Sequence, residues 1–152
     1  MTMQISFHSK LLGRLVLAMF LVSALGCEID TRVSISDAHN PPTFKLSGNG
    51  ILMTLFVYGP EASVNGFHKG IDEIKPIWKF DAPSSSQRIG DLPLIKYGET
   101  PAGFVQVEPK QGPPPPIIEG QYYMLVPVSG NANWHSICFI VSGGKTQEES
   151  CN

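Results

Sequence analysis

Histidine and carboxylate side chains come close together at one place in this sequence, in His68-Lys69-Gly70-Ile71-Asp72-Glu73. On a helix, His68 and Asp72 would share a face, because residues four apart are neighbours there, and both could contact one divalent metal ion. Gly70 interrupts that helix, and zinc sites use three or four protein ligands, whereas this stretch has no second histidine or cysteine. The stretch therefore favours a solvated surface turn, and the sequence predicts no metal site.

Nucleophilic catalysis has one pair of residues to consider, His135 and Ser136. Adjacent residues of a strand point to opposite faces, so His135 cannot readily activate its neighbour. The sequence also lacks the G-x-S-x-G, P-loop and G-x-G-x-x-G patterns. These observations predict a protein that is not an enzyme and needs no cofactor, and a hydrolase with scattered carboxylates is the least favoured alternative.

The N-terminus contains the parts of an export signal. Lys10 and Arg14 provide a positive region, and residues 15–25 form an uncharged apolar run. Such a run would rise only about 16 Å as a helix, roughly half of the ~30 Å hydrocarbon core, so it is too short to span a membrane comfortably. Small residues and a cysteine follow, in Ser23-Ala24-Leu25-Gly26-Cys27, as expected near a cleavage site.

These last five residues resemble the lipobox of bacterial lipoproteins, although Ala24 stands where leucine is most frequent. The resemblance implies that residues 1–26 are a cleaved signal peptide and that the thiol of Cys27 receives a diacylglyceryl group. Each buried methylene contributes about 0.8 kcal/mol, so two or three acyl chains would hold the protein on a membrane. We expect a cell-membrane or outer-membrane protein facing the periplasm or the exterior. Glu28 mildly favours the outer membrane, because the inner-membrane retention signal of some such families is aspartate.

An ordinary secreted protein, or an uncleaved anchor, is the alternative to this lipoprotein.

Cys138 and Cys151 are the cysteines that remain if Cys27 is lipidated. An oxidising compartment favours one disulfide between them, which would fasten the C-terminal tail to the last strand. A loop of this size would contribute roughly 3 kcal/mol to stability. Alternatively, Cys138 is a small buried hydrophobe and Cys151 a free terminal thiol.

Charge and composition exclude some classes of function. The chain has 11 Lys and Arg against 13 Asp and Glu, and Lys10 and Arg14 lie in the signal, so residues 27–152 have a formal charge of −4. They contain no basic run, so nucleic acid is not expected as a partner. The 15 glycines and 13 prolines place a turn-forming residue about every five or six positions, which favours short strands over long helices.

The fold class expected is all-β, an antiparallel two-sheet sandwich of seven or eight short strands; a closed barrel is the second choice. We expect residues 43–152 to form this domain. Residues 27–42 are expected to be the lipidated N-terminus and a short tether, in which residues 32–36 could add an edge strand. One chain of this length has the size of a single ordinary domain.

The strongest strand is expected at residues 51–58, with Ile51, Met53, Leu55 and Val57 on one face. Further strands are expected, with Trp78 as the anchor of the core, at residues 43–47, 76–80, 92–97, 103–108, 121–128 and 135–142.

Two segments do not fit a strand. Residues 61–75 are the only plausible helical or irregular insert. Residues 109–116 (PKQGPPPP) predict an extended, polyproline-like crossover on the surface, because prolines donate no ladder bonds. A stiff loop is the favoured interpretation of this crossover, ahead of a recognition motif.

The stretch Ile118-Glu119-Gly120-Gln121-Tyr122-Tyr123-Met124-Leu125 resembles the turn into the penultimate strand of fibronectin type III and related immunoglobulin-like domains. In those domains a tyrosine three residues after a glycine forms a tyrosine corner. The resemblance implies that the Tyr123 hydroxyl bonds a backbone group just upstream. It covers about eight residues, and residues 61–75 are long for such a domain.

We therefore expect a non-catalytic interaction or structural module of the cell envelope. It would be anchored to the membrane through its N-terminal lipid and would contact an envelope protein. The alternative is a lipoprotein that binds a small ligand or glycan through loop aromatics. Trp134 is the residue expected to do so, because it follows a loop of glycine and asparagine with no apolar partner nearby in the sequence.

Overall fold

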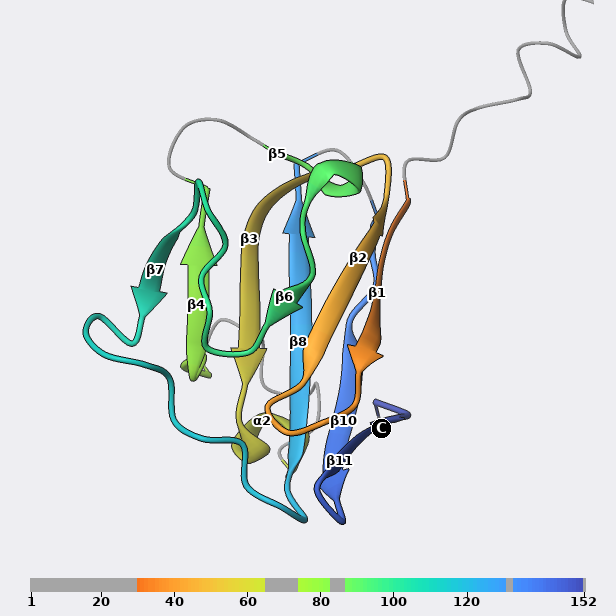
Figure 1. Ribbon diagram of the computed structural model, residues 1–152, viewed down its shortest axis with the longest axis vertical. Coiled ribbons are helices and arrows are strands. Elements are labelled where there is room, and N and C mark those ends of the chain that lie inside the picture. Colours follow the sequence, from red (N-terminus) through yellow and green to blue (C-terminus); the bar gives the residue numbers. More distant parts are fainter. Residues whose placement is uncertain (1–29, 65–73, 83–86, 131–132, 152) are drawn as a thin grey trace, which may run out of the picture.

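Two β-sheets pack face to face in the computed structural model, which describes residues 30–64, 74–82, 87–130 and 133–151 (Figure 1). The all-β class and the two-sheet sandwich expected from the sequence are confirmed. The described elements are, in chain order, β1 (Asp30–Asp37), β2 (Thr43–Gly48), β3 (Ile51–Tyr58), α2 (Pro60–Val64), β4 (Trp78–Asp81), β5 (Gln87–Arg88), the 3-10 helix η3 (Ile89–Asp91), β6 (Ile95–Lys96), β7 (Val105–Glu108), β8 (Tyr122–Ser129), β9 (Asn133–Trp134), β10 (Ile137–Ser142) and β11 (Lys145–Glu149).

The smaller sheet has the strand order β6-β2-β1-β9, and the larger sheet has the order β11-β10-β8-β3-β4-β7, with β5 beside β3. The strands pair antiparallel except β1 and β9, which pair in parallel over two residues each. In Figure 1 the smaller sheet lies in front of the larger one. β5, β9 and β11 were not expected, which is why the described part of the chain has more strands than the predicted seven or eight.

Strand β1 belongs to the sandwich and not to a tether. It pairs with β2 from Thr31 to Asp37. Val33 on this strand is buried in the core between the sheets. The boundary predicted between a tether of residues 27–42 and a sandwich of residues 43–152 is therefore too late in the chain.

A β-bulge changes the face assignment predicted for β3. The register of β3 against β8 shifts just after Leu52. The extra residue turns Leu52 to the face of Leu55 and Val57, and all three are fully buried in the core. Ile51 and Met53 were expected on that face, and they are instead half-buried and exposed.

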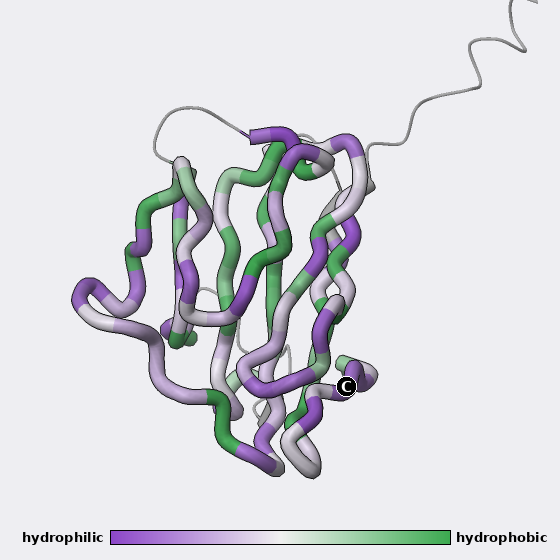
Figure 2. Tube along the Cα trace, in the orientation of Figure 1, coloured by the Kyte–Doolittle hydropathy of each residue, from purple (hydrophilic) through white to green (hydrophobic). Residues whose placement is uncertain are grey.

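Trp78 lies in the core, as expected, with none of its surface exposed. Its ring contacts those of Phe80 and Tyr97 edge-on, with centroids 5.2 Å away in each pair. Phe44 of the smaller sheet meets Phe139 of the larger sheet at 5.5 Å, so aromatic contacts join the two layers. Figure 2 shows hydrophobic stretches along the strands of the larger sheet and hydrophilic ones mainly at the turns.

Several strands differ in their bounds from the prediction. The strands expected at residues 76–80 and 103–108 are β4 and β7, and each begins two residues later. The strand expected at residues 92–97 is reduced to the two residues of β6. Pro93 explains the loss, because it has no N–H for a ladder bond, and η3 occupies the residues just before it.

The C-terminal tail forms a strand that the sequence analysis missed. β10 begins at Ile137, and β11 returns antiparallel beside it, with Ser142 opposite Lys145. Gly143 and Gly144 form the turn with φ angles of 60° and 72°. Both positions require the left-handed conformation that glycine adopts without strain, as in a type I′ hairpin.

A second apolar cluster covers the outer face of the larger sheet. Helix α2 packs there through Ala62, and half-buried Ile74 lies against the same cluster. This outer-face cluster consists of Tyr58, Ala62, Met124, Val126 and Cys138. The insert predicted for residues 61–75 is thus helical at its described start, and residues 65–73 lie outside the described residues.

Candidate functional site

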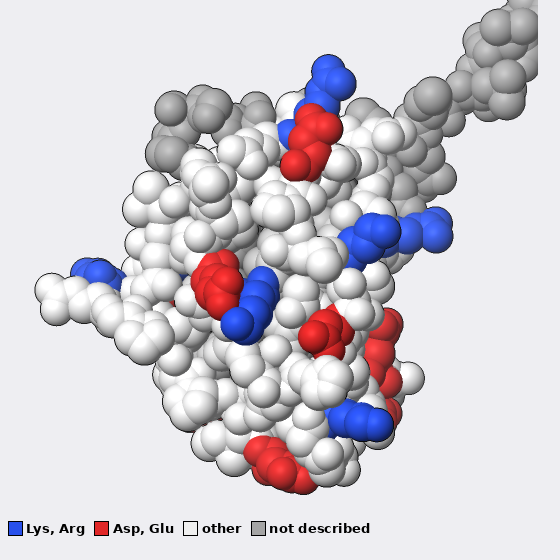
Figure 3. Space-filling view, viewed as in Figure 1, with Lys and Arg blue, Asp and Glu red and all other residues white. Residues whose placement is uncertain are grey.

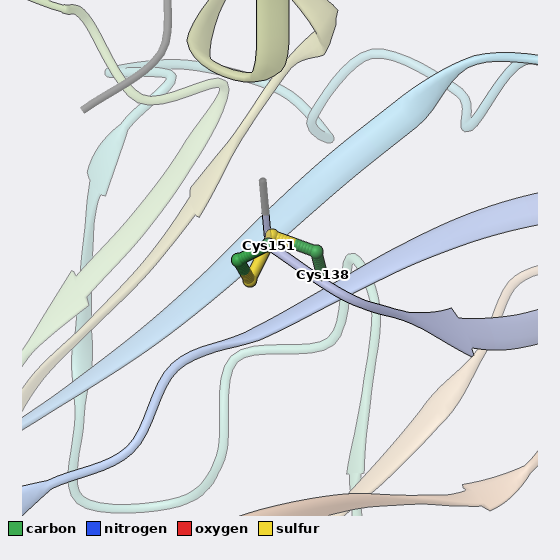
Figure 4. Close-up of a disulfide and its surroundings, with 2 residues drawn as sticks. All are labelled: Cys138 and Cys151. Atoms are coloured by element: carbon green, nitrogen blue, oxygen red, sulfur yellow. A yellow bond between two sulfur atoms is a disulfide. The ribbon is translucent and has the colours of Figure 1, made fainter. Parts of the chain in front are cut away.

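The predicted disulfide between Cys138 and Cys151 is confirmed (Figure 4). Cys138 lies on β10 and Cys151 follows β11, and their Cα atoms are 5.2 Å apart, within the usual range for a bridge. Both cysteines pack in the outer-face cluster. The bridge therefore fastens the tail to the larger sheet, as the sequence analysis expected.

The predicted lipidation residue, Cys27, lies outside the described residues. The described chain starts with β1 at Asp30, three positions later. Three extended residues reach at most about 10 Å. The end of the sandwich at which β1 begins, here called the tether end, is therefore close to Cys27 whatever path the chain takes between them.

Trp134, the residue predicted for ligand binding, has its backbone at this tether end. Strand β9 pairs in parallel with β1 so that Trp134 lies opposite Thr31 and Asn133 opposite Asp30. The Trp134 side chain lies outside the described part of the structure. The pairing places the backbone of Asn133 and Trp134 beside the start of β1.

The structure describes only some of the residues weighed for catalysis and metal binding. His135 is exposed and Ser136 half-buried on the connection between β9 and β10. His68, Asp72 and Glu73 lie outside the described residues. Among the residues that the structure describes, no three His, Cys, Asp or Glu side chains are grouped so as to hold a metal ion. No helix in the described segments has the length and apolar character needed to cross a membrane.

An open groove of about 410 Å³ lies at the opposite end of the sandwich, here called the groove end. Three segments line it, from residues 40–41 after β1, residues 96–99 after β6, and residues 113–117 of the crossover, which we define as residues 109–121 between β7 and β8. We call this cleft the proline groove.

Side-chain hydrogen bonds fasten the crossover along its length. The Gln106 side chain donates to the carbonyls of both Pro109 and Gly112, at 2.8 Å each. The Tyr97 hydroxyl donates to the carbonyl of Pro115 at 2.7 Å. A crossover without ladder bonds therefore still has a defined path, because side chains of neighbouring elements supply the donors that it lacks.

The exit of the crossover is held in the same way. Asn40 donates from its side chain to the carbonyl of Ile117 at 3.3 Å. The backbone N–H of Ile118 donates to the Tyr123 hydroxyl at 2.8 Å. The latter is the upstream backbone bond that a tyrosine corner requires at Tyr123, so that detail of the resemblance is confirmed. Ile117 itself is buried in the core.

No protein-family model matches the chain, and neither a curated protein nor a solved structure matches it significantly. The hydrogen bond at Tyr123 is thus the structural feature that fits the fibronectin-like resemblance. The family itself stays a prediction.

The electrostatics of the proline groove are set by one ion pair and one buried phenol. Lys96 and Glu99 form an exposed pair, with Nζ 2.7 Å from Oε1. Burial, and to a smaller extent Tyr123, raises the pKa of Tyr97 above its ordinary value of 10.0. Tyr97 therefore stays a neutral donor to the crossover. In Figure 3, charged side chains are scattered singly or in opposite pairs over the face that carries the smaller sheet.

Sequence reasoning missed the proline groove. Its three segments are far apart in the chain, and the pairings of β2 with β1 and of β2 with β6 bring two of them together. The one available signal was the run of four prolines at residues 113–116, which predicted a surface crossover but not what it would lie against.

Proposed function

We propose that this protein is a lipid-anchored, non-catalytic interaction module of a bacterial cell envelope, and that it binds another envelope protein. The lipobox-like residues ending at Cys27 support the anchor. The observation that carries the proposal is the start of β1 at Asp30, because so short a connection would hold the tether end against the membrane surface.

The same geometry supports a free groove end. Strand β1 runs from the tether end toward the proline groove and has eight residues, so the two ends are roughly 25 Å apart. A domain held by lipid at Cys27 would therefore direct the proline groove away from the membrane. A partner in the envelope would reach this end without displacing lipid.

Replacing Cys27 tests the anchor. The full chain with Cys27→Ser should no longer incorporate labelled palmitate and should move from the membrane fraction to the soluble fraction of a bacterial host. Cys151→Ser is the matched control and should leave both properties unchanged, because it removes a different thiol. Fractionation of Cys27→Ser like the unchanged protein would contradict the proposal.

The alternative function is binding of a small ligand or glycan through Trp134. That function predicts saturable binding of an oligosaccharide that Trp134→Ala abolishes. The interaction module predicts one envelope protein that is recovered at near-equal abundance after in-cell cross-linking and is retained in Trp134→Ala. The position of β9 at the tether end favours the module, because the backbone of Trp134 would then lie on the membrane side of the domain.

A further inference from the structure

We propose that the proline groove binds an aromatic side chain, tryptophan or tyrosine, displayed by the protein partner, with the crossover as a preformed polyproline ligand. This inference rests on the proposed function, since it names the surface and the chemistry through which the module would bind.

The prolines of the crossover present rings and carbonyls but no donors. Residues 113–116 are four consecutive prolines, without a backbone N–H among them. Proline fixes φ near −65°, and a residue that precedes proline is driven to the polyproline region, so the run adopts that helix. Pro114 is buried, whereas Pro113, Pro115 and Pro116 are exposed. Aromatic-lined surfaces recognise exposed polyproline of this kind.

The crossover is already ordered before any partner arrives. Bonds from Gln106, Tyr97 and Asn40 fix it at four carbonyls, and two of its own residues, Pro114 and Ile117, are buried. A segment that is held in its binding conformation loses little entropy when it binds. A defined path of this kind suits the recognition motif that the sequence analysis placed second to a stiff loop.

The opposite wall of the groove complements an aromatic side chain with a polar edge. Lys96 donates to Glu99 Oε1 at 2.7 Å. From this exposed pair the ammonium can still lie over a ring face, and the second carboxylate oxygen can accept from an indole N–H or a phenol O–H. The carbonyls of exposed prolines offer further acceptors. An aliphatic side chain would use none of these groups, and the groove volume of about 410 Å³ lies within the ~300–1,000 Å³ range of ligand sites.

The groove is poorly suited to a sugar. Glycans stack on the exposed face of an aromatic ring, but Tyr97, the aromatic residue that lines the groove, is only 6% exposed. Its hydroxyl is also occupied by the Pro115 carbonyl. The aromatic ring in this interaction must therefore come from the partner.

A titration of the full chain in detergent with N-acetyl-L-tryptophanamide tests the inference. Backbone amide signals are followed by ¹H–¹⁵N NMR, with N-acetyl-L-leucinamide and N-acetylglucosamine as comparison probes. We expect saturable shifts at Gly98, Glu99 and Gly112 with the tryptophan probe, and at least fivefold weaker binding of the leucine probe.

Two variants locate the site. Pro113→Ala with Pro116→Ala should weaken binding of the tryptophan probe at least fivefold, whereas Pro93→Ala, an exposed proline outside the groove, should not change it. The Ile118 amide signal reports whether the crossover keeps its path in the double variant. If it does not, Glu99→Gln takes the place of the double variant. We expect at least a twofold loss of binding, because the carboxylate acceptor is removed. The fold should be kept, because Glu99 is exposed and the change affects no core contact.

The inference is overturned if the tryptophan probe gives no saturable shift, if the leucine or sugar probe binds equally well, or if the shifts gather at the tether end. It is also overturned if the groove variants bind as the unchanged protein does. Such a failure leaves the proposed function standing when Cys27→Ser still releases the protein, since the partner would then bind elsewhere. If Cys27→Ser fractionates like the unchanged protein but the probe binds normally, the proposed lipid anchor fails and binding at the groove stands.

Discussion

The two ends of the sandwich close the same core in different ways. At the tether end, Gly50 lies so close to Thr31 and Ser129 that a Cβ there would be 2.6 Å and 2.7 Å from their hydroxyl oxygens. Ile89 of η3 is fully buried in the core at this end. At the groove end, side-chain hydrogen bonds to the crossover take the place of such close packing.

In the proposed arrangement, the end that is closely packed and the end that binds a partner are different ends of the domain. The tether end is closely packed around Gly50, and a membrane surface would lie beside it in the proposed arrangement. The groove end is held by bonds to backbone carbonyls, so proline rings can stay exposed without being free to move.

The largest effect is expected at the tether end. Ile89→Ala should lower the free energy of unfolding by about 3 kcal/mol, because it removes a fully buried side chain and leaves a cavity. Leu94→Ala is the control, since Leu94 is 55% exposed, and should change stability by less than about 0.5 kcal/mol. Urea denaturation measures both, and equal losses would show that η3 does not close the core.

Gly50→Ala should destabilise the protein by about 2 kcal/mol, because the new methyl group would overlap two buried hydroxyl groups. Gly90→Ala provides the matched control at the same end, since its nearest contact would be an ordinary 3.8 Å from the Gly48 carbonyl. Thermal unfolding compares the two variants. A tolerated Gly50→Ala would mean that the tether end packs more loosely than described.

Removal of one hydroxyl at each end should affect stability differently. Tyr97→Phe should lower stability by about 1 kcal/mol, because it removes the bond to the Pro115 carbonyl. Thr31→Val should be neutral or stabilising by up to about 1 kcal/mol, because the Thr31 hydroxyl is buried and has no hydrogen-bond partner in the described structure. Denaturant titrations of the two variants would contradict the contrast if both changes had the same sign and size.

The smallest effect is a pH dependence where β1 reaches the groove end. The backbone N–H of His39 donates to Oδ1 of Asp37 at 3.0 Å, and the Nδ1 atom of the His39 ring lies 2.6 Å from the same oxygen. These bonds lower the pKa of Asp37 below its ordinary value of 3.8. A lowered pKa means that this contribution to stability is present above pH 3.8 and is lost as the pH falls through the folded-state value.

Carbon NMR of the Asp37 carboxyl group measures that pKa. We expect a midpoint below 3.8, and His39→Ala should raise it only part of the way, because the backbone donor remains. A midpoint at or above 3.8 in the unchanged protein would show that the bonds to His39 are not kept in solution.

The sequence predicted the parts of the fold that depend on local patterns. The burial of Trp78 and the bridge from Cys138 follow from residue type and context, and the Tyr123 hydrogen bond follows from the resemblance to fibronectin-like domains. All three are confirmed. The bulge at Leu52 could not be predicted, because a strand with apolar residues on both faces does not indicate which residues face the core. Strand β11 was missed because its polar residues show no apolar alternation at the sheet edge.

The candidate site was less predictable than the fold. Four consecutive prolines indicated a surface crossover, but the groove depends on where Asn40 and Lys96 are brought by strand pairing. Such a juxtaposition is a property of the register between distant segments. A single sequence contains no local signal for it.

Photo-cross-linking from the two ends in living cells tests whether the partner binds at the groove end. A benzophenone amino acid is placed at Glu99 of the groove end or at Asn49 of the tether end, both exposed positions. We expect one near-stoichiometric protein adduct from Glu99 and no protein adduct from Asn49. The adduct from Glu99 should be lost when Pro113 and Pro116 are both changed to alanine. Capture of a partner from Asn49 and not from Glu99, or no capture from either position, would contradict binding at the groove end.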